Sequence, residues 1–227
     1  MRNSRPVASL LIASVLVTGL IGCAGPIVAD NPTAASTGAP ATEETATPTA
    51  AGDSPEWANS VTNPGELLTT IAGTDFQVEI YQVGTVAATK PGNFVNPDTN
   101  KPIIEVGAEL VYVNYVFTNT GPADIPLSYN LVAISARYAD WPYLQGMDNI
   151  TDFALDESMK INNTAIAPNK GEAPFAWPAG TSFSYGQNFL YQAGSQIEFA
   201  ATLTPSDASG DLDHDKKQEV AVSTSIK

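Results

Sequence analysis

The clearest pattern in the chain is the alternation of apolar and polar side chains that is typical of β-strands. Residues 75–86 (DFQVEIYQVGTV) place apolar side chains at every second position, as expected of a strand with one buried face. Residues 109–119 (ELVYVNYVFTN) are apolar on both faces, which predicts a central strand that is covered on both sides. Further strands are predicted at 103–106, 125–138, 181–191, 196–204 and 219–226.

The pattern also indicates the fold class. Beyond residue 66, no window of about a dozen residues combines a 3.6-residue apolar period with caps at both ends. About seven or eight strands punctuated by proline and glycine predict an all-β protein, an antiparallel β-sandwich with a long inserted loop. The composition turns globular near residue 66, and about 160 residues are enough for one domain. We therefore expect one sandwich domain over residues 66–227.

The beginning of the chain follows another pattern. Arg2 and Arg5 precede an uncharged segment of fourteen residues, VASLLIASVLVTGL, which is the layout of a secretory signal peptide. An uncleaved membrane helix is the alternative, because about 20 apolar residues can span a bilayer. The glycine and proline at Gly22 and Pro26 fit a processing site better than the interior of a span. We interpret residues 1–22 as a signal peptide.

The segment Leu20-Ile21-Gly22-Cys23, directly after the apolar core, resembles the lipobox of bacterial lipoproteins and points to a Gram-positive, actinobacterial source. In that family the cysteine thiol receives a diacylglyceryl group, and the signal is then cut before the cysteine. The resemblance implies that Cys23 is lipidated and holds the protein on the outer face of the cell membrane, since two or more acyl chains give lasting attachment. Cys23 is the only cysteine, so an internal disulfide and catalytic thiol chemistry are excluded.

The composition between anchor and domain differs again. Residues 23–65 are rich in Ala, Thr, Pro and Gly and hold few large apolar side chains, which predicts a flexible, disordered tether after the lipidated cysteine. Without residues 1–22 the chain has 8 basic and 24 acidic residues, a formal charge of −16. This charge argues against nucleic acid as a partner. A solvated acidic surface explains it most simply, and binding of divalent cations is the alternative.

Two longer segments carry a second resemblance. YVNYVFTNTGPADIPLS at 112–128 and WPAGTSFSYGQNFLYQAGSQIEFAATLTP at 177–205 resemble immunoglobulin-like domains of unknown function, which are common in lipoproteins and secreted proteins of Gram-positive bacteria. The shared features are turn chemistry and strand alternation, and the chain departs from the family in the long connection after Tyr138. The resemblance implies an immunoglobulin-like fold and an envelope location, and it implies no reaction.

The long connection is the first candidate for function. Residues 139–179 show no clear strand pattern, and loops of this length are often functional. Aromatic residues concentrate in this loop and in the hairpin after it. Either they form a satellite core, or some stay exposed to contact an envelope protein or a glycan. The candidate binding residues are Trp141, Tyr143, Phe153, Trp177 and Tyr185.

Two acidic groups are candidates for calcium. The first would line one face of a short helix over 148–160, where carboxylates repel unless a cation lies between them. The second lies in DLDHDKKQE at 211–219 and alternates like the start of an EF-hand loop, but Lys216 and Val222 replace the glycine and the acid that such a loop needs. Ordinary solvation is the simpler explanation of both. The acids are Asp148, Asp152 and Asp156 in the first group and Asp211, Asp213 and Asp215 in the second.

Motifs for catalysis are missing from the sequence. It has no Gly-x-Ser-x-Gly elbow, no phosphate-binding glycine loop and no second histidine. We therefore expect a membrane-anchored, non-catalytic binding or accessory module of the cell envelope that requires no cofactor. Two alternatives stay open, a calcium-binding structural or sensing sandwich and a carboxylate-dependent hydrolase of the cell wall, because carboxylates paired in space need no sequence motif.

Overall fold

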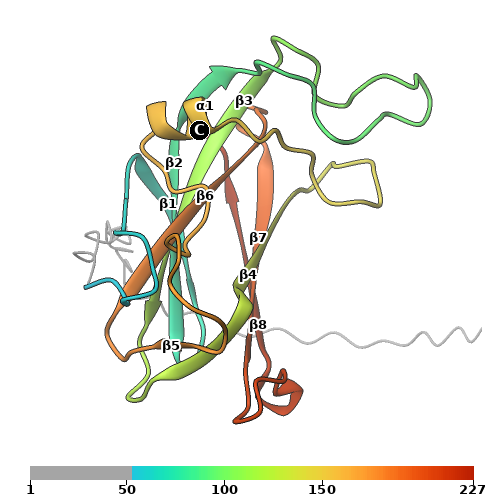
Figure 1. The fold of residues 1–227 in the computed structure, drawn as a ribbon. Helices are drawn as coiled ribbons and strands as arrows, with labels where there is room; N and C mark the ends of the chain where they lie inside the picture. The colour runs from blue at the N-terminus through green and yellow to red at the C-terminus, as the bar shows by residue number, and fades with distance from the viewer. Residues whose placement is uncertain (1–52) are drawn as a thin grey trace, which may run out of the picture. The chain divides into compact units, whose positions relative to one another are not determined.

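The computed structural model describes residues 53–227, which form two antiparallel sheets of four strands packed face to face (Figure 1). The strand order is β1-β2-β3-β6 in the first sheet and β5-β4-β7-β8 in the second. This confirms the predicted all-β sandwich. The strands are β1 (Glu66–Ala72), β2 (Phe76–Ala87), β3 (Glu109–Asn119), β4 (Ile125–Tyr138), β5 (Phe175–Trp177), β6 (Ser182–Leu190), β7 (Gln196–Pro205) and β8 (Gln218–Ser225), and the helices are α1 (Phe153–Ser158) and the 3-10 turn η1 (His214–Lys216).

Most of the predicted strands lie within one or two residues of their observed bounds, and the exceptions have physical reasons. The prediction at 103–106 is wrong: Ile104 is fully buried, but in a small cluster between loops rather than in a sheet. Strand β1 is missing from the prediction because a bulge between Leu67 and Thr69 breaks its alternation. Strand β5 is only three residues long, too short for a period to show.

The core between the sheets is rich in aromatic side chains. Phe117 on β3 stacks on Phe183 of the neighbouring β6, with 4.8 Å between ring centroids and 15° between planes. Tyr115, also on β3, meets Phe199 on β7 of the other sheet edge-on at 6.1 Å. All four side chains are fully buried. The two sheets are therefore joined by rings from strands that are far apart in the sequence.

The segment just before β1 also packs on the sandwich. Trp57 is 7% exposed, and its indole Nε1 donates a hydrogen bond of 2.6 Å to the carbonyl of Ala176. Its ring lies 5.3 Å from that of Phe175. Residues 53–65, which the sequence analysis assigns to the tether, thus contact the domain. A single tryptophan buries enough apolar surface to dock a segment whose average composition is polar.

The other expectations for the beginning of the chain concern residues that the structure does not describe. The signal peptide, Cys23 and the tether up to residue 52 all lie outside the described range. Within residues 53–227, no helix has the length and hydropathy needed to cross a membrane.

The outer face of the first sheet is covered, as predicted for its central strand. Nearly all of β3 is buried on both faces. Asn114 on β3 donates to the carbonyl of Thr62 at 2.8 Å, and Gly186 on β6 donates its backbone N–H to the carbonyl of Asn162 at 2.8 Å. The segments around Thr62 and Asn162 therefore form a third layer over this sheet.

Burial of the tyrosines predicts a steep loss of stability in alkali. Burial, with help from the neighbouring Glu79, raises the pKa of Tyr81 to about 12. A tyrosine phenol ionises more easily in the unfolded chain, where its pKa is near 10. The contribution that this difference makes to the free energy of unfolding is therefore fully present below about pH 10 and is lost as pH rises from there through 12. We expect tyrosinate absorbance to appear together with loss of the β-sheet circular dichroism signal. Full tyrosinate absorbance in a folded chain would contradict this. Burial likewise raises the pKa of Tyr112, Tyr115, Tyr138 and Tyr185.

Candidate binding surface

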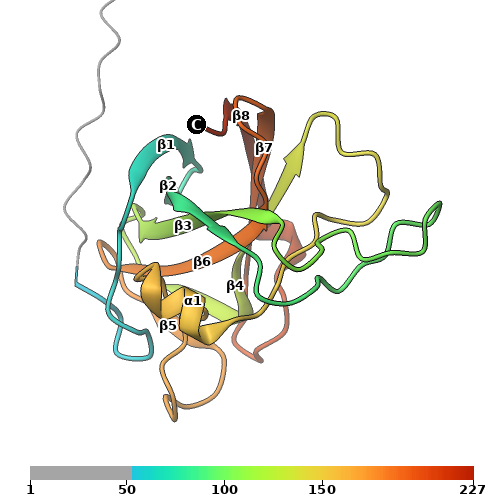
Figure 2. The ribbon, with the colours of Figure 1, turned by 90° about the horizontal axis from the view of Figure 1, so that it is seen from above.

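Two loops project from one end of the sandwich and together form what we call the arm (Figures 1 and 2). The arm consists of residues 88–108, between β2 and β3, and residues 139–152, between β4 and α1. The first loop folds back on itself: Ile103 donates its backbone N–H to the carbonyl of Phe94 at 2.9 Å. The arm therefore has internal structure although it contains neither helix nor strand.

Asp148 joins the two loops of the arm. Its carboxylate is 1% exposed and accepts backbone hydrogen bonds from Asn93, in the first loop, and from Asn149, both at 2.9 Å through Oδ1. The amide of Asn93 reaches back to the carbonyl of Asn149 at 3.2 Å. These contacts tie one loop to the other through Oδ1, whereas Oδ2 is buried without a hydrogen-bond partner among the described residues.

A glycine makes room for this carboxylate, which leads to a prediction. A Cβ atom added at Gly92 would lie 2.0 Å from Oδ2 of Asp148, so Gly92→Ala must displace the buried carboxylate. We expect a loss of stability of about 1–3 kcal/mol and faster amide hydrogen exchange in both loops. The matched control is Gly146→Ala in the same arm, where an added Cβ meets nothing within 4 Å. Equal behaviour of the two variants would show that Asp148 does not hold the arm.

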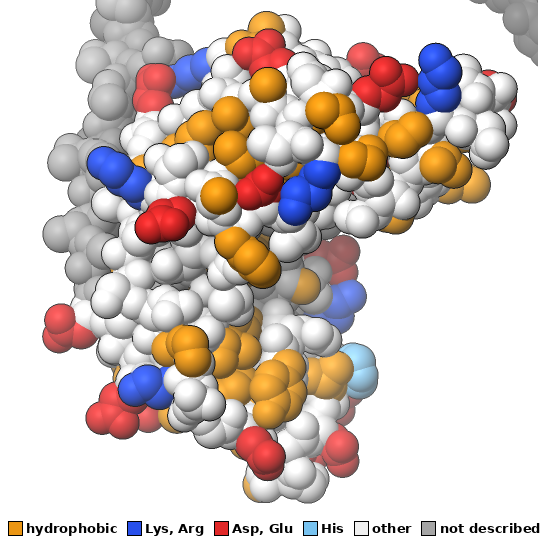
Figure 3. Space-filling view, turned by 45° about the horizontal axis from the view of Figure 1, so that its top comes forward, with side chains coloured by type: hydrophobic (Ala, Val, Ile, Leu, Met, Phe, Trp, Pro, Cys, Tyr) orange, Lys and Arg blue, Asp and Glu red, His pale blue; other side chains and the backbone are white. Residues whose placement is uncertain are grey.

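The arm exposes apolar side chains. Among residues 53–227, four of the seven exposed large apolar side chains belong to it, and Figure 3 shows apolar side chains along its surface. Patches of this kind on a soluble domain mark interaction sites. The four are Phe94 (36% exposed), Val95 (52%), Val106 (65%) and Leu144 (98%).

A groove runs along the base of the arm. Its volume is about 720 Å³, and its lining includes Val106, Trp141, Tyr143 and Leu190. Trp141 and Tyr143 pack edge to face with 5.2 Å between centroids, and Trp141 donates its indole N–H to the carbonyl of Gln145 at 3.2 Å. The groove therefore has a fixed aromatic wall and includes one of the exposed apolar residues, Val106.

The five aromatic residues predicted to bind do not share one surface. Trp177 is fully buried in the core, and Tyr185 stacks on Phe117 at 5.0 Å inside the sandwich. Phe153 is 67% exposed on α1 and lies outside the arm. Only Trp141 and Tyr143 contact each other. Trp177 and Tyr185 therefore belong to the main core rather than to a separate satellite cluster, and Trp141, which is 7% exposed, packs in the same core. Tyr143 is half-buried in the lining of the groove, where a partner could touch it.

The acids of the first calcium candidate have three separate roles. Asp152 caps α1, accepting from the backbone of Ala154 at 3.1 Å and of Leu155 at 3.2 Å. A hydrogen bond from Thr89 is the main cause that lowers its pKa. Asp156 is the buried residue of α1 itself, whereas Asp148 lies between the two loops of the arm. Their side chains are used locally and do not converge on a common point.

The second acidic group is likewise dispersed. Asp213 pairs with Lys216 at 2.8 Å, and the hydrogen bond from this lysine lowers the pKa of Asp213. Asp211, before this pair, and Asp215, between its two residues in the chain, are both exposed. Across the described residues, no three His, Cys, Asp or Glu side chains are grouped so that they could hold a metal ion. The acids of neither calcium candidate are therefore brought together in the described residues.

Because Asp156 is buried, we expect its replacement to stabilise the protein, whereas most substitutions destabilise one. Burial raises the pKa of Asp156, and the nearby Tyr112 hydroxyl offsets part of this effect. A raised carboxyl pKa favours the folded state at low pH, and this contribution is lost as pH rises from about 4 through the raised value. At pH 7, Asp156→Asn should therefore raise the unfolding temperature by about 1–3 °C. At pH 3 it should give no gain, and Asp215→Asn, at an exposed acid, should give little at either pH. A loss of stability at pH 7 would contradict this.

Comparison with known proteins assigns no family. No family model matches the sequence, and none of the curated proteins is similar to it. Among solved structures, YcdA of Bacillus subtilis subsp. subtilis str. 168, provisionally described as a lipoprotein, is similar at 16% identity and a TM-score of 0.38, over 72% of this chain and 39% of YcdA. A functionally unknown protein of Listeria monocytogenes EGD-e is similar at 13% identity and a TM-score of 0.38, over 72% of this chain and 83% of its own. This chain thus matches well under half the length of YcdA, and its structural neighbours include a lipoprotein-like bacterial protein.

Proposed function

We propose that this protein is a lipid-anchored, non-catalytic binding module of the bacterial cell envelope, an immunoglobulin-like sandwich whose arm holds a protein partner. The resemblance of residues 20–23 to a lipobox supports the anchor at Cys23. The observation that carries the binding function is the set of four exposed apolar side chains on the arm, one of which, Val106, lines the groove with the aromatic wall. A buried carboxylate holds this surface in shape before any partner arrives.

The chemistry of the arm favours protein over a lipid surface. Its first loop balances two basic residues with two acids, and its second loop adds three acids and no base. Anionic membrane surfaces attract basic segments, so the arm is not suited to lie on them. Its aliphatic side chains with an aromatic neighbour are typical of the centre of a protein interface.

The groove at the arm supports a function without catalysis. The titratable side chains in its lining are Lys101, Glu105 and Tyr143. Hydrolysis of a glycosidic bond by the usual route needs two carboxyl groups flanking the bond, and this groove offers one. Its shape and apolar lining are suited to binding.

Fatty-acid labelling tests the anchor. Cells fed a fatty-acid analogue should label the wild-type protein, and Cys23→Ala should remove the label and release the protein from the membrane fraction. A wild-type protein without label would overturn the anchor while leaving the binding proposal intact.

Charge placed on the arm tests the partner. The double variant Val106→Asp and Leu144→Asp should remove the protein from its complex on native gels of gently solubilised membranes. Both side chains are exposed, so the unfolding temperature should not change. The control Phe153→Asp alters an apolar residue outside the arm that is about as exposed as Val106, 67% against 65%, and should leave the complex intact. A complex that survives the double variant would refute the assignment of the arm.

A further inference from the structure

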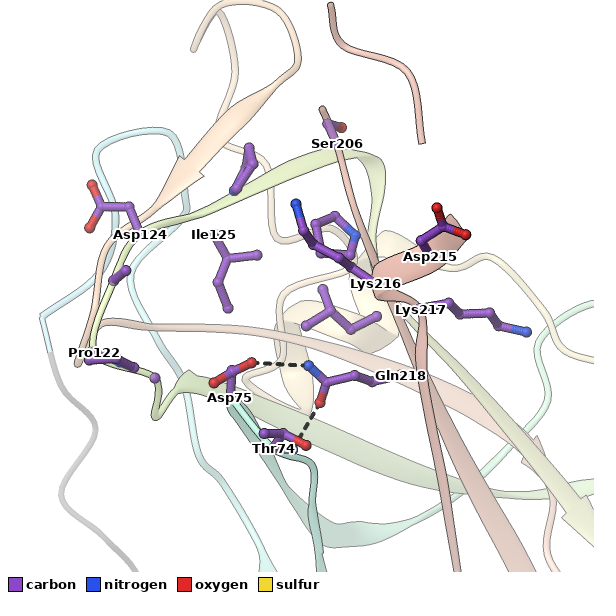
Figure 4. Close-up of a pocket in the computed structure, with 15 residues that line it drawn as sticks. Thr74, Asp75, Pro122, Asp124, Ile125, Ser206, Asp215, Lys216, Lys217 and Gln218 are labelled. Atoms are coloured by element: carbon purple, nitrogen blue, oxygen red, sulfur yellow. Dashed lines mark hydrogen bonds between the residues drawn. The ribbon is translucent and has the colours of Figure 1, made fainter. Parts of the chain in front are cut away.

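A second groove (Figure 4) lies at the end of the sandwich opposite the arm (Figure 1). It has a volume of about 580 Å³ and is formed by the turn between β1 and β2, the connection from β3 to β4, and the segment from the end of β7 to the start of β8. Volumes of this size are typical of sites for small ligands or short peptide segments. Its lining shares no residue with the groove at the arm.

The floor of this groove is apolar and held in place. Ile125, Pro126, Leu203 and Pro205 supply apolar surface. Gln218 at the start of β8 accepts a hydrogen bond from the backbone of Thr74 at 2.8 Å, and its amide donates to Asp75 at 3.2 Å. Figure 4 shows this bridge between the two sheets at one side of the groove. Because the bridge ties the elements together, the groove exists without a ligand.

The charged side chains around the floor differ in their pairing: the lysines form ion pairs and the acids do not. Both lysines of the lining already have partners outside it: Lys216 pairs with Asp213 at 2.8 Å, and Lys217 pairs with Glu219 at 2.7 Å. The carboxylates at its two sides make no such ion pair, and Asp124 accepts only a backbone hydrogen bond from Ala179, at 3.3 Å. Among the described residues, no ion pair involves the lining acids, which leaves uncompensated negative charge beside an apolar floor. Figure 4 shows the two lateral acids, Asp124 and Asp215, on opposite sides of Ile125.

One buried hydroxyl of the lining is also without a partner. Ser206 is 4% exposed, and its Oγ makes no hydrogen bond within the described structure. Its backbone N–H donates to the carbonyl of Pro126 at 2.8 Å, so the residue itself is fixed. An unsatisfied buried hydroxyl costs about 1–3 kcal/mol. A ligand that supplies a polar group to this hydroxyl would recover part of that cost.

We propose that this groove binds a lysine side chain, flanked by apolar residues, in a peptide segment of a partner protein. The alkyl stem of the lysine covers the apolar floor, as such stems do on apolar surfaces, and its ammonium group compensates the lateral carboxylates. A polar backbone group of the same segment meets the Ser206 hydroxyl. An anionic ligand would meet carboxylates on both sides, because the two lysines are already paired. The groove is therefore a cation-selective peptide site, separate from the arm.

A titration followed by nuclear magnetic resonance tests this inference on the unlipidated chain from Cys23 to Lys227. The probe is a short end-capped peptide with a central lysine between leucine and proline residues, and its control carries norleucine in place of lysine. We expect saturable shifts of the backbone amides of Ser206 and Gln218, and at least about tenfold weaker binding of the norleucine peptide, as lost pairing with a carboxylate implies. Equal binding of the two peptides, or no shift at these amides, would overturn the proposal.

Variants separate the site from general charge effects. The double variant Asp124→Asn and Asp215→Asn should weaken the lysine peptide about tenfold, whereas the exposed pair Asp98→Asn and Asp211→Asn should not. Ser206→Ala should weaken binding while leaving the unfolding temperature unchanged or higher, because it removes an unsatisfied group. That combination cannot arise from a folding defect, so unchanged affinity in this variant would count against the site. The arm variants should bind the peptide normally, so this test and that of the proposed function fail independently.

Discussion

Replacing Trp177 with alanine should destabilise the domain by about 3–5 kcal/mol, the usual cost of deleting a buried large aromatic side chain. Trp177 is fully buried, and its ring lies 5.0 Å from that of Phe183. Its indole N–H donates to the carbonyl of Thr181 at 3.1 Å, so the substitution leaves a cavity and an acceptor without its partner. Domains are stable by only about 5–15 kcal/mol in total, so this loss is a large fraction of that stability.

Urea unfolding measures this loss, with Phe153→Ala as the matched control. Phe153 is 67% exposed, so its truncation should change the free energy of unfolding by less than about 1 kcal/mol. If Trp177→Ala left the midpoint near that of the wild type, the position of this tryptophan in the core would be wrong, and its role as a binding residue would return.

Asn119→Ala should cost about 3 kcal/mol or more, although it removes no apolar surface. The side chain is fully buried at the end of β3. Its amide donates to the carbonyls of Ala123 at 3.0 Å and Trp177 at 2.8 Å, and its Oδ1 accepts from the backbone of Gly121 at 2.9 Å. Two carbonyls would lose the donor that Asn119 supplies, whereas the Gly121 N–H would keep its second acceptor, the carbonyl of Asp75 at 3.1 Å. Each buried group left unsatisfied costs about 1–3 kcal/mol.

Two further variants identify the cause. Asn119→Asp keeps the acceptor for Gly121 but turns a carboxylate towards two carbonyl oxygens, so it should be at least as damaging as alanine. Asn163→Ala, at an exposed asparagine, should be close to neutral. Thermal unfolding of the three proteins measures these differences, and a mild effect of Asn119→Asp would show that the amide donors contribute little.

The strands were predictable where side-chain periodicity is strong. Strand β3 is apolar on both faces because a third layer covers its outer side. Its apolar composition is what predicts that both faces are buried. Strand β1 lost its period to a bulge at Leu67, and β5 needs only three residues because Ile125 and its neighbours on β4 pair with it. Pairing between distant segments is not visible in local alternation. The strand predicted around Ile104 was wrong for the same reason, since a loop can bury an apolar residue without pairing with another strand.

The candidate site was predictable only in part. The long loop after Tyr138 contributes to the arm, but its aromatic richness pointed equally to Trp177, which belongs to a strand hidden inside the loop. The exposed residues Val106 and Leu144 carry no local signal, because exposure depends on what the rest of the chain covers. Acids at helical spacing suggested a shared ligand, yet the Asp148 carboxylate accepts a hydrogen bond from the backbone of the other loop instead.

Site-specific photo-crosslinking in living cells tests the binding role of the arm most directly. A photoreactive amino acid placed at Leu144 or at Val106, both exposed on the arm, should trap the same partner protein as one discrete adduct. The same amino acid at Phe153, exposed outside the arm, should give no such adduct. If position 153 trapped that adduct equally well, or if neither arm position trapped a protein, the arm would not be the binding surface.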